Sequence, residues 1–299
     1  MFINTNFGIM IRKVGDFYGF NWYGLDYFCF FAKSKTNKKM NKFTKAIAAI
    51  MLMMIFTVSC NKPDEPNNGG NNNGQNDTIV DNSGSLNGHD YVDLGLPSGT
   101  LWATCNVGAD TPEGYGNYFA WGETEPKEIY DWSTYRYCNG DYDQLTKYSV
   151  LFHAYGDVYE NYGYNGFLDS LRIMQPSDDA ATVNWGEGWR TPTEGESCEL
   201  FHQCSHTWET HDGVNGLLIT GTNGNSIFLP AGGVQGVLSG NVGIDEFNQV
   251  GHSGQYWTNS IDWDYPYFGS EFYFPYGNDG MSRSERCNGL LVRPVCTVK

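Results

Sequence analysis

Histidine and acidic side chains are the first candidates for chemistry in this 299-residue sequence. His202 and His206 stand four residues apart, and Glu209 and His211 follow them. Two imidazoles at that spacing on one helix would lie on the same side and could share a metal ion. The first histidine is not followed by the glutamate of a metalloprotease motif, and the third ligand is unspecified. We therefore interpret these residues as surface histidines and predict no metal site.

A second candidate is the acidic segment that holds Asn139, Asp141 and Asp143. Oxygen ligands alternate in this way in calcium-binding loops. Gln144, however, stands where such a loop requires glycine. Because acidic loops often only face water, we predict neither a calcium ion nor any other cofactor.

Cysteine chemistry has six candidates after residue 60: Cys105, Cys138, Cys198, Cys204, Cys287 and Cys296. No CxxC pair occurs among them, which disfavours a zinc ribbon or a thioredoxin-like site. Disulfides and buried thiols both remain open for these residues. GxGxxG, GxxxxGK[ST] and GxSxG motifs are also absent, which disfavours nucleotide binding and common hydrolase mechanisms. We predict that the protein is not an enzyme.

An export signal precedes the cysteine-containing region. The basic stretch Met40–Lys45 is followed by the 11-residue apolar run Ala46–Phe56 and by Thr57-Val58-Ser59-Cys60. The apolar run is too short for a transmembrane helix, which needs about 20 residues. We predict a lipoprotein signal peptide over 40–60, with lipid attached to Cys60 after cleavage. A buried helix that ends at a chance cysteine is disfavoured, because polar Asn/Gly sequence follows at once.

The segments on either side of this signal have distinct predicted roles. Residues 1–39 precede a complete signal peptide, so we interpret them as a mis-called extension and Met40 as the true start. Residues 61–86 begin with a stretch rich in Asn, Gly and Pro, which predicts a flexible linker. Asp64 and Glu65 resemble the acidic signal of some surface lipoproteins. We therefore expect an outer membrane lipoprotein at the cell surface.

Charge limits the partners that the exported part can have. From residue 61 onward the chain has ten Lys and Arg against 32 Asp and Glu, a net charge of −22. Such a charge repels nucleic acid and anionic membrane surfaces. We predict no nucleic-acid partner, and contact with the membrane only through the lipid anchor.

Residues 87–299 have the length of one domain with many short strands. Thr193 is the predicted N-cap of one helix, and one further helical turn is predicted over 178–184. Residues 216–229 predict a hairpin around Asn223-Gly224, because Asn-Gly favours the two-residue turn. Strands are also predicted over 255–260 and 290–295, whereas 127–166 has no clear periodicity. These patterns favour an α+β domain with mostly antiparallel strands.

Five ordered motifs of this domain resemble a known family, the Fibrobacter succinogenes major paralogous domain. The motifs are YVDLGLPSGTLWA at 91–103, YFAWGET at 118–124, GWRTPT at 188–193, YWT at 256–258 and VRPV at 292–295. The resemblance covers about residues 88–296. It implies a C-type-lectin-like fold, related to formylglycine-generating enzymes and to binding proteins diversified by retroelements.

We expect the tryptophans and arginines of these motifs to have structural roles. Trp102 and Trp121 are predicted to fill the core. Arg190 is predicted to form an ion pair or to bind carbonyl groups, and Arg293 to hold the last strand against its sheet.

The resemblance suggests two activities, but the residues that each activity requires are absent from this sequence. Formylglycine-generating enzymes depend on a cysteine pair that neither Cys287 with Cys296 nor Cys198 with Cys204 matches. The calcium-dependent sugar site of C-type lectins uses a tripeptide that ends in Asn or Asp, but Gln175-Pro176-Ser177 ends in serine. Catalysis and calcium-dependent sugar binding are therefore both disfavoured.

The remaining candidate is a recognition surface rich in Tyr, Trp, Asn and Asp near the C-terminus. Such side chains combine a large contact area with adaptable hydrogen bonding. The predicted ligand-binding residues are Asn259, Asp262, Trp263, Asp264, Tyr265, Tyr267, Tyr273, Tyr276, Asn278, Asp279, Arg283 and Arg286. We expect them to bind an extracellular protein or glycan. The alternatives are a carbohydrate-binding module and a hypervariable retroelement target whose variable segment is 257–288.

Overall fold

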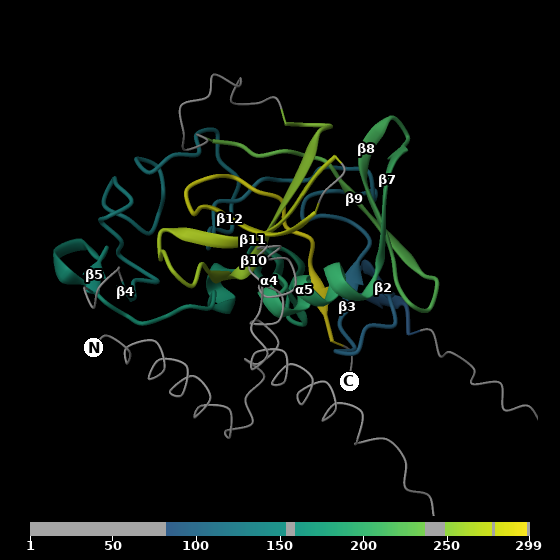
Figure 1. Cartoon of the computed structure of the whole chain (residues 1–299), viewed down its shortest axis with the longest axis horizontal. Helices are drawn as coiled ribbons and strands as arrows, with labels where there is room; N and C mark the ends of the chain where they lie inside the picture. The colour runs from purple at the N-terminus through teal and green to yellow at the C-terminus, as the bar shows by residue number, and fades with distance from the viewer. Residues whose placement is uncertain (1–81, 154–158, 237–248, 277–278, 298–299) are drawn as a thin grey trace, which may run out of the picture. The chain divides into compact units, whose positions relative to one another are not determined.

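Short antiparallel strands in several small sheets dominate the secondary structure, with few helices (Figure 1). The computed structural model describes residues 82–153, 159–236, 249–276 and 279–297. All of them belong to one compact unit of the chain. The predicted α+β class with mostly antiparallel strands is confirmed. The predicted signal peptide, the extension 1–39 and Cys60 lie outside the described residues.

A five-stranded sheet joins the first and last parts of the domain. Its order is β1-β2-β3-β13-β6, formed by Gly84–Leu86, His89–Asp93, Leu101–Ala103, Val295–Cys296 and Trp189–Arg190. Asn87 and Gly88 both have positive φ, as a two-residue turn between β1 and β2 requires. Strand β1 lies within the segment predicted as linker, so the predicted domain start at residue 87 is a few residues too late.

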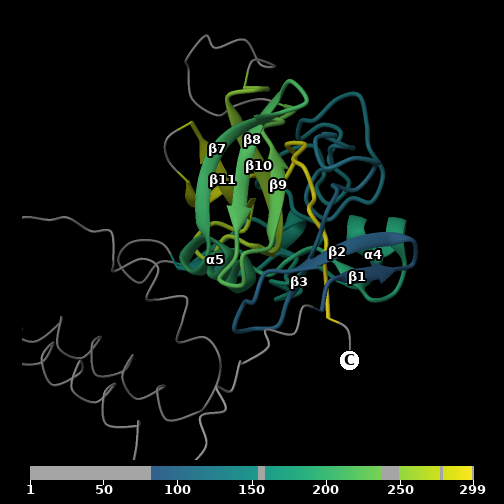
Figure 2. The ribbon, with the colours of Figure 1, turned by 90° about the vertical axis from the view of Figure 1, so that its right-hand side faces the viewer.

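A second sheet contains β7 (Ser205–His211), β8 (Val214–Thr220) and β9 (Ser226–Pro230) (Figure 2). The β8–β9 hairpin was predicted, but five residues, 221–225, connect its strands instead of the predicted two-residue Asn223-Gly224 turn. The preceding hairpin, β7–β8, turns at Asp212-Gly213, whose φ angles are both positive. Sequence patterns did not identify β7, because its exposed positions alternate irregularly with half-buried ones.

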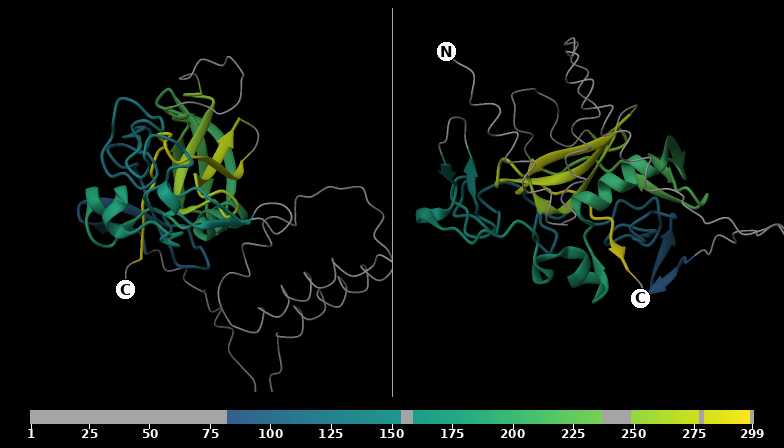
Figure 3. Two further views of the ribbon diagram at one scale, coloured as in Figure 1. Left: turned by 90° about the vertical axis from the view of Figure 1, so that its left-hand side faces the viewer. Right: turned by 60° about the horizontal axis from the view of Figure 1, so that its bottom comes forward.

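The third sheet, of order β10-β11-β12, lies between the other parts of the domain. Its strands are Ser253–Ile261, Phe268–Pro275 and Gly280–Glu285. The small hairpin of β4 (Leu151–His153) and β5 (Tyr159–Asn161) lies on one side of it and the β7–β9 sheet on the other (Figures 1 and 3). The predicted strand 290–295 is mostly irregular, because Leu290 and Leu291 form only isolated bridges.

Two α-helices are described, α4 (Ala180–Trp185) and α5 (Glu194–Gln203), with single 3-10 turns η3 (Tyr164–Gly166) and η4 (Pro176–Asp178). Thr193 caps α5 as predicted, and Glu196 completes a capping box by accepting from the backbone of Thr193. Asp179 caps α4 through the N–H of Ala181.

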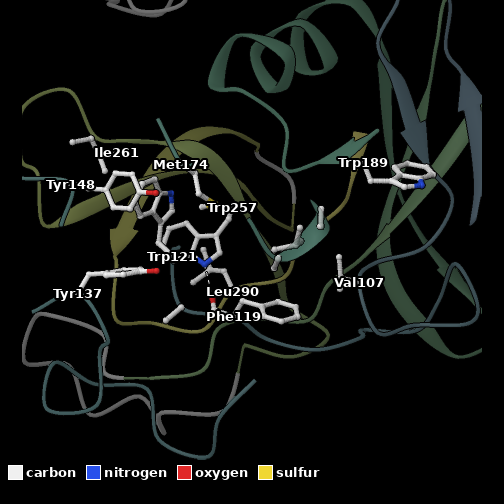
Figure 4. Close-up of a cluster of buried hydrophobic side chains, with 14 of the residues drawn as sticks. Val107, Phe119, Trp121, Tyr137, Tyr148, Met174, Trp189, Trp257, Ile261 and Leu290 are labelled. Carbon is white, nitrogen blue, oxygen red and sulfur yellow. Dashed lines mark hydrogen bonds between the residues drawn. The ribbon is translucent and has the colours of Figure 1, made fainter. Parts of the chain in front are cut away.

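The core consists of two clusters of buried side chains, one of which Figure 4 shows. In that cluster the indoles of Trp121 and Trp257 are fully buried. Trp257 Nε1 donates to the carbonyl of Phe119 at 2.7 Å, and Trp121 Nε1 donates to that of Thr258 at 2.9 Å. The core role predicted for Trp121 is therefore confirmed, and Trp102 lies buried in the second cluster.

The two motif arginines also have the predicted structural roles. Arg190 forms a bidentate ion pair with Glu196, at 2.5 and 2.7 Å. Arg293 is 1% exposed and donates to the carbonyls of Ala103, Thr104 and Phe228. Arg293 thus connects β3, β9 and the segment that leads into β13.

Candidate ligand-binding surface

The connection between β10 and β11 forms a tightly hydrogen-bonded turn. Asp262 Oδ1 accepts from the backbone N–H of Asp264 at 3.0 Å and of Tyr265 at 2.8 Å. The N–H of Asp262 donates to the carbonyl of Phe268 at 2.9 Å. Trp263 stands on this turn with 69% of its surface exposed. A large apolar side chain is therefore presented to solvent from a well-anchored backbone.

Arginine side chains hold this turn from two directions. The guanidinium of Arg172 lies 4.6 Å from the ring centroid of Trp263, and its Nη1 donates to the Trp263 carbonyl at 3.3 Å. Partial burial lowers the pKa of Arg172. The guanidinium of Arg283 lies 4.8 Å from the Tyr265 ring and pairs with Asp262 at 3.3 Å. These contacts restrict the rotamers of Trp263 and Tyr265.

Residues of the long segment 127–166, which has no clear periodicity, complete the surface. Phe152, on β4, stacks on Tyr265 with ring centroids 4.7 Å apart. Tyr267 lies 5.1 Å from both Tyr142 and Tyr162. We use the name aromatic face for this group: Tyr142, Phe152, Tyr162, Trp263, Tyr265 and Tyr267.

The aromatic face contains half-buried rings as well as exposed ones. Tyr142 is 43% exposed, whereas Phe152, Tyr162, Tyr265 and Tyr267 are half-buried. Burial raises the pKa of Tyr162, and hydrogen bonding to Glu160 raises it further. The phenol of Tyr162 therefore stays neutral at physiological pH and acts only as apolar surface and as a hydrogen-bonding group.

Asn259 and Arg286 belong to the interior, and their prediction as ligand-binding residues is wrong. Arg286 is completely buried and donates to the carbonyls of Lys147, Tyr148 and Pro266. Burial of a cation is tolerated here because its N–H groups have acceptors. Asn259 is 7% exposed, and its carbonyl accepts from Met174.

The other predicted residues divide into two groups at opposite ends of β11. Asp262, Trp263, Asp264, Tyr265, Tyr267 and Arg283 lie at or beside the aromatic face. Tyr273, Tyr276 and Asp279 lie toward the far end of the strand, roughly 20 Å away at about 3.3 Å per residue. Asn278 lies outside the described residues. The predicted single patch is therefore two separate sites.

The far group has structural contacts of its own. Tyr276 is 76% exposed and meets Trp208 edge-on, with ring centroids 5.5 Å apart. Asp279 Oδ2 lies 2.5 Å from His206 Nδ1. His206 lies on β7, not on the helix with His202 as the metal interpretation required, because α5 ends at Gln203.

Several sequence candidates for chemistry form no site in the described part of the chain. No group of three or more His, Cys, Asp or Glu residues is placed to bind a metal there. The six described cysteines form no disulfide. Burial raises the pKa of the Cys204 and Cys296 thiols to about 11, so both are protonated and weakly nucleophilic at neutral pH.

The residues that the sequence analysis missed are Tyr142, Phe152, Tyr162 and Arg172. All precede the predicted patch by about a hundred residues in the chain. For the three aromatic residues the only sequence signal is the high tyrosine content of the aperiodic segment 127–166, and Arg172 lies beyond that segment. Periodicity analysis cannot indicate which distant turn such a segment contacts.

Comparisons with protein-family models, curated proteins and solved structures found no match to this chain. Among the helices of the described residues, none is both long and apolar enough to cross a membrane.

Proposed function

We propose that this chain is a lipoprotein of the cell envelope, anchored at Cys60, whose domain binds an extracellular protein or glycan without catalysis. The 11-residue apolar run before Cys60 supports the anchor. The five motifs and the small antiparallel sheets support a C-type-lectin-like fold. Localisation at the outer membrane, facing the cell exterior, belongs to the same proposal.

The main support for the binding role is Trp263, whose indole is exposed to solvent. Hydrogen bonds within the β10–β11 turn fix the backbone that carries this side chain. Exposure of a large apolar ring costs free energy in water, and a ligand that covers it recovers that free energy. Because Arg172 and Asp262 already restrict the turn, binding costs little additional conformational entropy. Trp and Tyr with neighbouring Arg are also the side chains most often found at the energetic centre of interfaces.

The experiment has two stages. The purified protein is first screened on a glycan array and by cross-linking to proteins of neighbouring cells, and each ligand found is then titrated. We expect Trp263→Ala to weaken binding at least tenfold, since interface tryptophans commonly contribute about 2 kcal/mol or more. The matched control is Tyr276→Ala, which removes a still more exposed ring outside the aromatic face. Equal effects of the two substitutions would refute the assignment of the site.

A hypervariable retroelement target remains an alternative for the segment 257–288, and the structure limits where variation could be tolerated. Trp257, Phe272, Phe274 and Arg286 are buried in this segment. The exposed positions described in this segment are Trp263 and Asp264 in the turn, Tyr276 just after β11, and Ser282 and Arg283 in the middle of β12. A near-identical template repeat beside the gene, with differences confined to codons for exposed positions, would support this alternative.

A further inference from the structure

The aromatic face already binds guanidinium groups, namely those of the chain itself. Arg172 lies over the Trp263 ring at 4.6 Å, and Arg283 lies over the Tyr265 ring at 4.8 Å. Cations are attracted to ring faces at such distances, and the planar guanidinium also stacks on them. This end of the surface therefore presents ring faces in a geometry that suits arginine.

The part of the aromatic face that contains Tyr142 and Tyr162 has neighbouring carboxylates, whereas Trp263 and Tyr265 have neighbouring arginines. Tyr142 lies between the exposed residues Asp141 and Asp143 in the chain. Tyr162 Oη donates to Glu160 Oε2 at 2.7 Å, and Glu160 is exposed as well. Within the described ranges, none of these three carboxylates forms an ion pair with a lysine or arginine. The exposed ring of Tyr142 thus occurs together with carboxylates that have no lysine or arginine partner in the part of the chain that the structure describes.

The chain has few cations of its own to neutralise this end. Its formal net charge is −16. Lys147 is paired with Asp178, and Arg283 is paired with Asp262. The carboxylates around Tyr142 therefore have no cationic partner among the described residues. Their electrostatic field attracts cationic ligands and repels anionic ones.

We propose, building on the binding role of the aromatic face, that its partner is a protein segment that carries arginine. A guanidinium of the partner stacks on Tyr142 and pairs with Asp141, Asp143 and Glu160. Arginine fits better than lysine because its planar group satisfies a ring and a carboxylate at once, as Arg283 does with Tyr265 and Asp262. A neutral glycan would stack on the rings and donate hydroxyl hydrogen bonds to the carboxylates, but it would form no ion pair with them.

The test uses the purified chain and a synthetic peptide of alternating arginine and glycine, titrated at about 150 mM salt, where long-range attraction is screened. The site variant is Asp141→Asn with Asp143→Asn and Glu160→Gln. The control variant is Asp90→Asn with Asp110→Asn and Glu187→Gln, which removes the same charge from exposed positions elsewhere. We expect binding to weaken at least tenfold in the site variant and less than threefold in the control. Tyr142→Leu, which keeps apolar bulk but removes the ring, is expected to weaken binding about fivefold.

Three outcomes would overturn the proposal. Equal losses in the two charge variants would show that the peptide responds only to net charge. Binding of a lysine–glycine peptide as tight as that of the arginine peptide would remove the role of ring stacking. If Trp263→Ala abolishes binding of an identified glycan while the arginine peptide does not bind, the binding role of the aromatic face stands and the arginine partner is refuted. Thermal unfolding of each variant establishes that the fold is intact.

Discussion

Glu271 should make the protein less stable as the pH rises from acid toward neutral. This residue lies in the middle of β11, between Trp257 on β10 and Ser282 on β12. It is 4% exposed, and its Oε2 has no hydrogen-bond partner in the described part of the chain. Burial raises the pKa of Glu271 from 4.5 to about 8. The carboxyl group is therefore mostly neutral in the folded protein at pH 7.

The sign and size of the effect follow from this shift in pKa. The folded state holds the proton more tightly than the unfolded state, so the free energy of unfolding falls between pH 4.5 and pH 8. The fall is about 1.4 kcal/mol per pH unit, or roughly 3 kcal/mol between pH 4.5 and pH 7. Glutamine has nearly the same shape and cannot ionise. We therefore expect Glu271→Gln to match the wild type near pH 4.5 and to exceed it by about 3 kcal/mol at pH 7.

Urea unfolding of both proteins at intervals from pH 4.5 to pH 8.5 measures this difference, and the titration of all other groups cancels in it. Glu187→Gln, at an exposed position, is the control and should leave the pH dependence unchanged. Parallel pH profiles for the wild type and Glu271→Gln would contradict the reasoning, because they would mean that the carboxylate is charged and solvated in the folded state.

Three further predictions concern the anchor and the fold. Cys60→Ser should abolish incorporation of labelled fatty acid and release the protein from the membrane fraction; continued labelling would refute the lipidation site. Arg293→Lys should lower the free energy of unfolding by about 3 kcal/mol, because lysine cannot reach all the carbonyls that the buried guanidinium binds; urea unfolding with an unchanged midpoint would argue against it. Thr193→Ala should cost about 1 kcal/mol through loss of the capping box of α5, and the same assay would detect a smaller loss if the cap contributes nothing.

Local sequence signals predicted the elements whose structure is determined locally. The Thr193 cap, the β8–β9 hairpin and the cores formed by Trp102 and Trp121 follow from cap chemistry, turn chemistry and aromatic burial. Strand β1 was missed because it is only three residues long and mostly exposed, so no apolar alternation marks it.

Tertiary arrangement explains the errors at the candidate site. Composition alone does not distinguish an exposed arginine from one whose guanidinium donates to buried oxygen atoms, and Arg286 is of the second kind. Sequence proximity also does not show that Trp263 and Tyr276 lie beyond opposite ends of one strand, β11. The sequence analysis therefore placed both residues in one patch. The contribution of Tyr142 and Phe152 depends on how a long irregular segment folds back on the β10–β11 turn.

The most direct test of the binding role is the footprint of a bound ligand on the protein. Nuclear magnetic resonance of the isotope-labelled protein, with and without the ligand found in the screen, would follow the Trp263 indole N–H and the backbone amides of 262–267. We predict that these signals shift on binding, whereas the amides of β7 and of 273–276 stay unchanged. A footprint on β7 and Tyr276, with Trp263 unaffected, would contradict this prediction.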